Sequence, residues 1–284
     1  MEQNTPHNPL SPDTTEGMNQ LTRRQLLQVS AGTLGLLATS SISLAGLCPS
    51  VTTPRQTRGP FFPYDQVVSF PIREEDDESL PLILSNDNDL TFIKGKPGKA
   101  QGQIIYFRGQ VLSGGTSDSK VCQPIPGATV LLWQANFSGR YNHKGDDSSP
   151  QHFPHPKTGK LIERVQDDYF QYWGKAVTDE QGHFLFKTIL PSFYPAADDW
   201  YRPPHLHFSI QAKGHPEFVT QTYFKGDALP NIGIIQDLNA KDWILRNPKI
   251  SPAQQEQVIV EYAPDQAQNL QDGLVGTCQF LLPE

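Results

Sequence analysis

Cysteine is scarce in this 284-residue chain, and its scarcity excludes some kinds of site. The three cysteines are Cys48, Cys122 and Cys278, and no two of them form a CxxC pair. A zinc site built from thiolates is therefore not expected. Cys122 and Cys278 could form a disulfide if the mature protein lies outside the cytoplasm, or both could be buried free thiols. The sequence leaves these two alternatives open.

Clusters of positive charge and unbroken apolar runs are also missing. The net charge is -7, and the chain has no Lys/Arg cluster beyond one N-terminal arginine pair. Binding to nucleic acid or to an anionic membrane is therefore not expected. Ser and Thr interrupt the apolar part of residues 21–47 too often for a stable membrane span. The sequence contains neither a Walker loop nor a dinucleotide-binding glycine fingerprint.

The N-terminus is arranged like an export signal. Arg23 and Arg24 precede an apolar segment rich in Gly, Ala and Ser. Basic residues before an apolar core are typical of signal peptides, and the arginine pair in TRRQLL is typical of the twin-arginine type. We expect residues 1–48 to be this signal and the mature protein to be periplasmic or extracellular; an amphipathic helix of the folded domain is the alternative. A lipid anchor at Cys48 is not expected, because Leu47 stands where a lipoprotein signal has a small residue.

Proline and glycine, by contrast, are plentiful, with 25 and 22 residues, and this favours short strands over helical bundles. Residues 49–100 lack periodicity and are expected to form an extended arm. Residues 101–284 predict a mostly β catalytic domain, an antiparallel β-sandwich with long loops and a few short helices. The expected strands are 104–112, 128–135, 183–189, 205–211, 217–224 and 276–282, and the expected helices are 239–246 and 251–262.

The stretch WYRPPHLHF places two of the eight histidines, His205 and His207, two residues apart. Alternate residues of a strand share a face, so both imidazoles would project together, with Leu206 on the other side. Two imidazoles and one carboxylate would make a common type of iron site. The nearest acids upstream are Asp198 and Asp199, which lie in a loop, and the strand itself carries none.

Two tyrosines offer a different ligand set. Tyr141 and Tyr194 each lie in a loop that follows an expected strand. A free phenol has a pKa of about 10, so only a strongly acidic cation would deprotonate it at neutral pH. Ferric iron is such a cation. Two phenolates and two neutral imidazoles would hold Fe(III) with a net charge near +1 and would stabilise the ferric state.

Four segments together resemble the intradiol ring-cleavage dioxygenases. They are, in chain order within residues 103–228, WQANFSGRYNHK, TDEQGHFLFKTILPSFYP, RPPHLHFSI and TQTYFKGD. The resemblance is strongest to the iron-binding chain of the protocatechuate 3,4-dioxygenases. RGPFFP, residues 58–63, is also similar to a segment near the start of those chains, and Gly59 and Pro60 would then line the substrate pocket.

The resemblance implies a site and a reaction. The implied ligands of Fe(III) are Tyr141, Tyr194, His205 and His207. Arg202 would stabilise negative charge on the substrate, Gln221 would lie behind the metal, and Tyr194 would leave the metal to accept a proton. A catechol-type ring and O2 would react to give a cis,cis-muconate-type diacid. No partner chain is implied by the residues themselves, and a homo-oligomer is compatible with the pattern.

Other interpretations are open at this point. A non-catalytic β-sandwich binding module could have the same fold, and a zinc-dependent hydrolase could use the two histidines with an acid. The segment from Tyr194 to Arg202 is shorter than in the protocatechuate enzymes, and Tyr201 is an extra aromatic residue that could rival Tyr194 as a ligand. Arg202 could instead form an ordinary ion pair with Asp198 or Asp199.

Overall fold

The computed structural model of the chain describes residues 48–63, 87–114, 121–226, 229, 233–265, 270 and 272–283. The chain divides into two compact units, 1–43 and 44–284. The first unit, which carries most of the expected signal, lies outside the described residues. In the described part of the second unit, no helix is long and apolar enough to cross a membrane.

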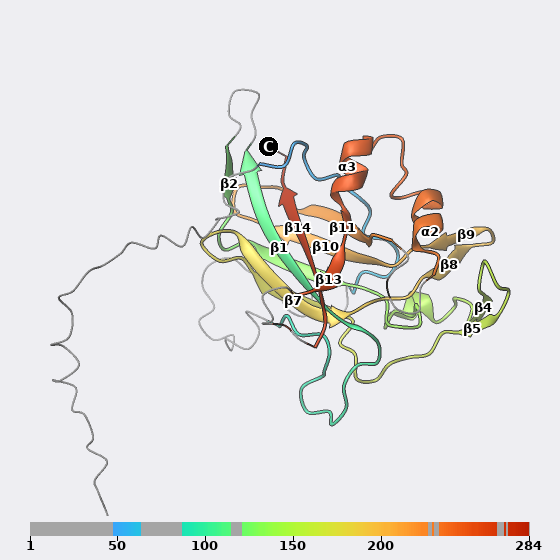
Figure 1. Cartoon of the computed structure of the whole chain (residues 1–284). Coiled ribbons are helices and arrows are strands. Elements are labelled where there is room, and N and C mark those ends of the chain that lie inside the picture. Colours follow the sequence, from blue (N-terminus) through green and yellow to red (C-terminus); the bar gives the residue numbers. More distant parts are fainter. Residues whose placement is uncertain are drawn as a thin grey trace, which may run out of the picture. The chain divides into compact units, whose positions relative to one another are not determined.

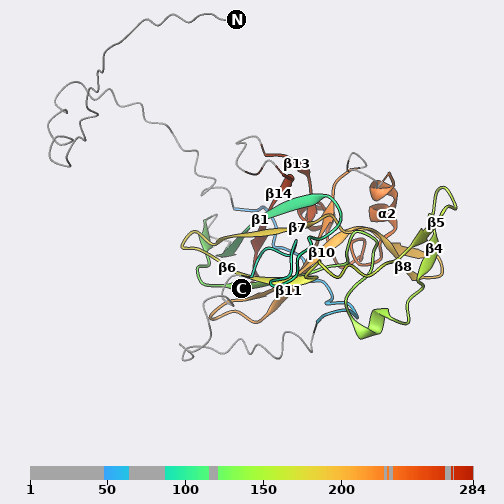
Figure 2. The same cartoon turned by 90° about the horizontal axis from the view of Figure 1, so that it is seen from below.

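Two five-stranded sheets form the domain and face one another (Figures 1 and 2). The first sheet has the order β13-β14-β1-β2, with β7 also paired to β1, and the second has the order β12-β11-β10-β3-β6. The mostly β fold expected from the sequence is therefore confirmed. The first sheet contains β1 (Ile104–Gly114), β2 (Cys122–Pro124), β7 (His183–Ile189), β13 (Tyr262–Pro264) and β14 (Leu274–Leu281), and the second contains β3 (Thr129–Trp133), β6 (Trp173–Val177), β10 (His205–Gln211), β11 (Phe218–Phe224) and β12 (Ile259–Val260).

Aromatic and aliphatic side chains fill the space between the two sheets. The ring of Phe107 on β1 lies 4.7 Å from the ring of Phe208 on β10, measured between centroids. Leu206 and Ile210, the neighbours of Phe208 on the same face of β10, are fully buried in the same core. Because side chains alternate along a strand, the residues between them point to the other face of the sheet. The core thus determines which way the two histidines of β10 project.

The pairing of distant strands differs from the expected antiparallel pattern at two places. β14 runs parallel to β1, and β12 runs parallel to β11. β14 thus pairs antiparallel with β13 on one side and parallel with β1 on the other. No local turn signal records this second pairing.

The two helices have different bounds from those expected. The first, α2, spans Ile235–Lys241. It ends because the next residue, Asp242, is extended and its carboxylate accepts hydrogen bonds from the following backbone. The second, α3, spans Pro252–Gln257, and Ser251 caps it with Gln254 in a capping box. It stops earlier than expected because Ile259–Val260 pair with β11 as β12.

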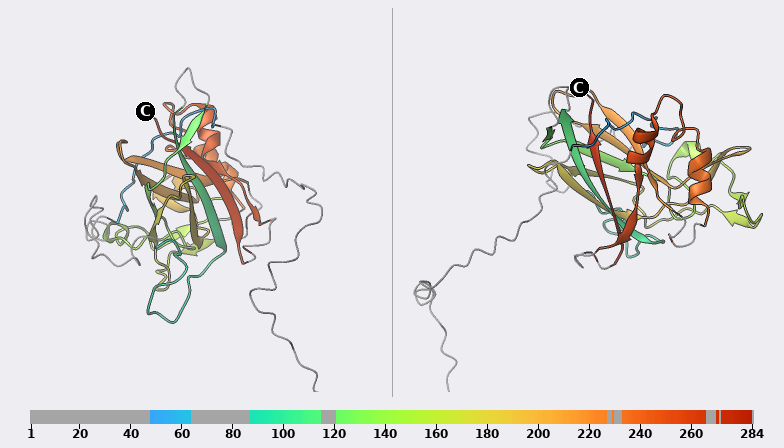
Figure 3. Two further views of the ribbon diagram at one scale, coloured as in Figure 1. Left: turned by 90° about the vertical axis from the view of Figure 1, so that its left-hand side faces the viewer. Right: turned by 45° about the horizontal axis from the view of Figure 1, so that its top comes forward.

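Two short hairpins lie at one end of the domain beside α2 (Figures 1 and 3). One is formed by β4 (His152–Pro154) and β5 (Leu161–Glu163), and the other by β8 (Tyr194–Ala197) and β9 (Trp200–Arg202). The second hairpin carries a predicted ligand at its start and the predicted catalytic arginine at its end.

The cysteine pairing differs from both alternatives left open by the sequence. Cys122 forms a disulfide with Cys48, and Cys278 is a buried free thiol. The arm that starts at Cys48 brings the two Cα atoms within 5.3 Å of each other. Beyond the disulfide, the arm hydrogen-bonds to both sheets, through Thr53 N to Leu281 O (3.0 Å) and Gln56 N to Val219 O (2.9 Å).

Loss of the disulfide is expected to destabilise the domain. The bond closes a loop with a sequence separation of 74, so it restricts the unfolded chain considerably. For the variant C48A/C122A we expect the free energy of unfolding to fall by about 2–4 kcal/mol. Denaturant unfolding with and without a thiol reductant measures this. Reductant should lower the denaturant midpoint of the unaltered protein and leave that of the double variant unchanged. An unaltered protein with the same midpoint in the presence and absence of reductant would contradict the expectation.

Candidate metal centre

The structure brings the four predicted ligands together in one buried cluster. The hydroxyl oxygen of Tyr141 lies 3.3 Å from Nε2 of His205 and 3.2 Å from Nε2 of His207. The two Nε2 atoms are 3.0 Å apart. The ring of Tyr194 meets that of Tyr141 edge-on at 5.7 Å and lies 5.9 Å from the ring of His205. All four side chains are buried.

Each of these side chains is positioned by a strand or by the end of one. His205 and His207 lie on β10, which pairs with both β3 and β11. Trp133 at the end of β3 stacks on His207, with ring centroids 4.8 Å apart and an angle of 11° between the planes. Tyr141 lies in the loop that follows β3, and Tyr194 is the first residue of β8.

The histidines have lone pairs available at the centre of the cluster. Nδ1 of His205 lies 2.6 Å from the carbonyl oxygen of Pro203. Because a carbonyl can only accept, this nitrogen carries the proton, and Nε2 presents its lone pair towards Tyr141 and His207. Burial, and then the positive charge of Arg202, hold the pKa of both imidazoles well below the usual range. Both are therefore neutral, the form that binds metals.

The tyrosines require a strongly acidic cation before they can act as anionic ligands. Burial raises the pKa of Tyr141 well above its ordinary value, and it also raises the pKa of Tyr194. Both phenols are neutral at pH 7 in the absence of a cation. A trivalent ion that displaces the two protons would gain two hard anionic oxygens, and this donor set fits ferric iron.

The spacing of the donor atoms also fits a single metal ion. Imidazole nitrogens bind metals at about 2.1 Å, so two of them 3.0 Å apart would subtend roughly 90° at a shared ion. A zinc site with a carboxylate ligand lacks support within the described ranges. No group of three His, Cys, Asp or Glu side chains suited to a metal occurs there.

Arg202 lies beside this cluster in a different partnership from the one considered from sequence. It is opposite Tyr194 in the β8–β9 hairpin and is buried. Its Nε donates to Oδ2 of Asp242 at 2.7 Å, and its Nη2 donates to Oε1 of Gln221 at 2.6 Å. The ion pair of Arg202 is thus with Asp242 and not with Asp198, because β9 turns the guanidinium inward.

The extra aromatic residue of this hairpin, Tyr201, is not near the cluster. Its hydroxyl donates to the carbonyl of Pro154 at 3.0 Å, and its ring packs against Phe153 and Phe193. It lies on the opposite face of β9 from Arg202, as strand alternation requires. The alternative in which Tyr201 replaces Tyr194 as a ligand is therefore wrong for this fold.

The N-terminal arm covers the cluster from the other side. The backbone of Gly59 has a φ of +70°, and a Cβ there would lie 3.5 Å from Cε1 of His207. The ring of Phe61 packs on Tyr141 with centroids 4.8 Å apart. Gln221 donates its side-chain amide to the carbonyl of Thr57 at 2.8 Å. The expectation that residues 58–63 lie beside the site agrees with this placement.

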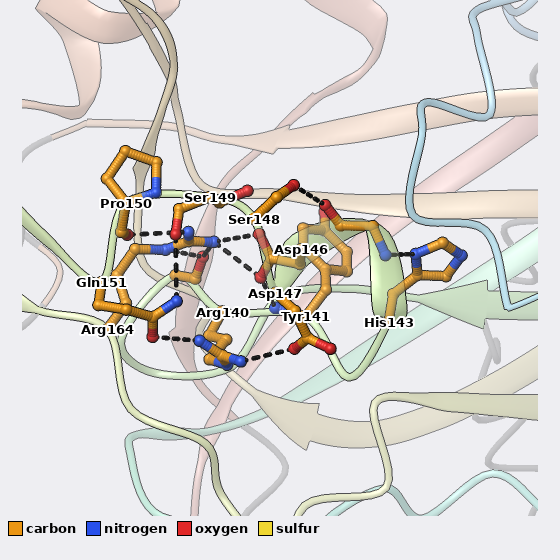
Figure 4. A network of polar contacts seen from close by, with 12 residues as sticks. Arg140, Tyr141, His143, Asp146, Asp147, Ser148, Ser149, Pro150, Gln151 and Arg164 are labelled. Atoms are coloured by element: carbon orange, nitrogen blue, oxygen red, sulfur yellow. Dashed lines mark hydrogen bonds and ion pairs between the residues drawn. The ribbon is translucent and has the colours of Figure 1, made fainter.

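A buried ion pair that no sequence pattern indicated holds the loop of Tyr141 (Figure 4). Nη2 of Arg164 lies 2.8 Å from both carboxylate oxygens of Asp146, and neither side chain is exposed. Arg164 also donates to the carbonyl of Gly139 at 2.7 Å, and Asp146 accepts from the backbone N of Tyr141 at 2.8 Å. The Arg164 guanidinium carbon lies 5.6 Å from the centroid of the Tyr194 ring. The pair therefore contacts both tyrosines of the cluster.

Comparison with known proteins identifies the family. The model of the dioxygenase family matches residues 83–267, well over half of the chain. The chain belongs to this family of intradiol dioxygenases, and the resemblance found in its sequence is confirmed.

Among curated relatives, the protocatechuate 3,4-dioxygenase beta chain of Burkholderia cepacia is 36% identical over 146 residues, covering 50% of this chain and 54% of the relative. The 6-chlorohydroxyquinol 1,2-dioxygenase of Cupriavidus pinatubonensis is 29% identical over 147 residues, covering 47% of this chain and 42% of the relative. The matched segment thus spans about half the length of these relatives. A solved intradiol ring-cleavage dioxygenase from Tetranychus urticae is 21% identical to this chain, and the match covers 81% of this chain and 94% of the solved chain, with a TM-score of 0.49.

Removal of Arg164 is expected to destabilise the domain strongly. In R164M, Asp146 would be left as a buried carboxylate without its cation, which costs about 3–5 kcal/mol of unfolding free energy. Denaturant unfolding of the purified variant measures the loss. The matched control is D147N, because Asp147 belongs to a neighbouring pair with Arg140 but is 68% exposed; its loss should be below about 1 kcal/mol. Equal effects of the two substitutions would contradict the structural role assigned to the buried pair.

Proposed function

We propose that the chain catalyses the Fe(III)-dependent cleavage of a catechol-type ring by O2, between the two hydroxylated carbons, to give a cis,cis-muconate-type diacid. The observation that carries this proposal is the convergence of two phenol oxygens and two imidazole nitrogens in one buried cluster. Family membership supports the same conclusion. The names of relatives include protocatechuate, hydroxyquinol and catechol dioxygenases, and all three compounds carry adjacent ring hydroxyls.

The donor set assigns the residues their roles. His205, His207, Tyr141 and Tyr194 would hold Fe(III), which supplies the Lewis acidity that favours loss of the catechol protons. Tyr194 would take one of these protons on its phenolate oxygen as it leaves the coordination shell. Burial raises the pKa of Tyr194, so the protonated phenol is the stable form once it has left.

Arg202 would stabilise negative charge that develops on the substrate ring. Its Nε and Nη2 donate to Asp242 and Gln221, and its guanidinium also interacts with the hydroxyl of the buried Tyr223. Burial alone would lower the pKa of Arg202, but tyrosines in their phenolate form and the Asp242 carboxylate raise it, so the side chain stays protonated. A fixed cation in a dry site acts more strongly than one in water.

A visible absorption spectrum tests this function. Iron-loaded protein should show a wine-red band from phenolate-to-iron charge transfer, and the band should shift when a catechol is added without oxygen. The variant Y141F should lose most of the band, whereas Y169F, at a 37% exposed tyrosine of the surface, should keep it. Protein that stays colourless after iron loading would overturn the dioxygenase proposal and favour the non-catalytic binding module.

We further propose that the mature chain acts outside the cytoplasm on catechols from its surroundings, such as plant phenolics. The arginine pair before an apolar segment supports export, and a disulfide between Cys48 and Cys122 is typical of oxidising compartments. For Cys48 to keep this bond in the mature chain, the signal must end before Cys48 and not at residue 48, and a sulfur engaged in the bond is not free to carry a lipid. Fractionation of cells expressing the full chain should place it in the exported fraction, and R23K/R24K should retain it inside. Equal retention of both forms in the cytoplasm would contradict export.

A further inference from the structure

Arg202 is a buried cation whose direction is fixed by two acceptors. It is 4% exposed, its Nε bonds to Oδ2 of Asp242, and its Nη2 bonds to Oε1 of Gln221. Asp242 is the anionic partner, at 2.7 Å, and its side chain is completely buried. A guanidinium with two of its three nitrogens anchored cannot rotate freely, so the third nitrogen keeps one orientation.

Asp242 is itself held rigidly, because its two oxygens have separate partners. Oδ2 accepts from Arg202, and Oδ1 accepts from the backbone nitrogens of Ile244 (3.1 Å) and Leu245 (2.7 Å). One turn earlier, the side-chain amide of Asn239 donates to the carbonyl of Phe224 on β11 at 2.8 Å. The segment that carries Asp242 is therefore attached to the sheet that carries the histidines.

A second contact joins the same two segments. Trp243, the neighbour of Asp242, stacks on Trp200, with ring centroids 4.8 Å apart and 13° between the planes. The guanidinium carbon of Arg202 lies 5.6 Å from the centroid of the Trp200 ring. Trp243 is 66% exposed, so this stack orders an aromatic side chain that would otherwise lie in solvent. The carboxylate and the indole thus fix β9 at adjacent points.

We propose that Asp242 is a positioning residue for catalysis, which holds Arg202 so that its guanidinium faces the reacting ring and not the tyrosine ligands. This inference rests on the proposed function. Tyr194 lies directly opposite Arg202 in the β8–β9 hairpin, and the ring of Tyr141 meets that of Tyr194 at 5.7 Å, so as phenolates both would attract the guanidinium. Without the Asp242 carboxylate, the guanidinium would turn towards those ligands and would stabilise the ground state of the site in place of charge on the substrate.

The substitution D242N separates the two tasks of this side chain. Asparagine keeps an oxygen for the backbone of Ile244 and Leu245, but it removes the negative charge and the acceptor facing Nε of Arg202. We expect kcat for catechol to fall by about 10- to 100-fold. The dissociation constant for catechol, measured without oxygen from the charge-transfer band, should change less than about 3-fold. The matched control is D237N, because Asp237 lies on α2 in an exposed ion pair with Lys157; both quantities should stay unchanged there.

A double-mutant cycle decides whether Asp242 acts through Arg202. If it does, D242N should lower kcat in the unaltered protein but have no further effect in the R202Q background. If the kcat of the double variant instead falls by the product of the two single-variant factors, the proposal is overturned. If D242N alone does not fold, D242E keeps the charge and displaces it by one methylene. The expected result is then a lowered kcat with a nearly unchanged catechol dissociation constant, and a kcat equal to that of the unaltered protein would overturn the proposal.

The outcomes separate this inference from the function on which it rests. Unaltered protein that forms no coloured iron complex, or that consumes no catechol, would mean that the proposed function has failed. Unaltered protein that is coloured and active, together with a D242N variant of the same kcat, would mean that only the role of Asp242 is wrong. A merely structural role would instead change the catechol dissociation constant along with kcat, and the effect of D242N would persist in the R202Q background.

Discussion

The alternation of side chains along β10 is the constraint on which the rest of the site depends. Leu206 and Phe208 are fixed in the core between the two sheets, so His205 and His207 must project from the opposite face. A register shift of one residue would exchange the two sets and place imidazoles in the main core. The hydrophobic stabilisation of the sandwich is therefore also what holds the two nitrogen donors side by side, 3.0 Å apart.

Burying four polar donors on that face creates a second requirement, which the surrounding charges meet. A low-dielectric site keeps imidazoles neutral and phenols protonated, as the directions of their pKa shifts indicate. The two buried cations beside it, Arg202 and Arg164, each have a buried carboxylate, so neither is left as an unpaired charge. Each pair also fixes a loop or strand that carries a tyrosine of the cluster. Charge balance and geometry are thus provided by the same side chains.

Local signals predicted the strands β1, β3, β7, β10, β11 and β14 but missed β6 and the shorter strands, and the family resemblance was needed to assign the four clustered residues as ligands. The segment HLHFSIQ has a strand pattern and two histidines two apart, and Ser251 is followed by residues typical of a helix start. The partnership of Arg202 with Asp242 joins residues on different elements, and the loop pair of Arg164 with Asp146 has no periodic spacing. Cys48 was assigned to the expected signal, so its pairing with Cys122 was missed. Contacts between residues far apart in the sequence depend on the conformations of the loops between the strands, and a short sequence pattern does not predict these.

The arm explains why the site lies on the face of the second sheet that the first sheet does not cover. Phe62 meets Trp133 edge-on at 4.7 Å, and together with Tyr141 and Tyr194 they form a second, smaller apolar cluster there. The first sheet cannot shield this face, so the arm supplies the cover while leaving a glycine beside His207. Exclusion of water is what makes a fixed cation effective near developing charge. The arm anchored at Cys48 is therefore part of the environment in which Arg202 acts, although it lies far from it in sequence.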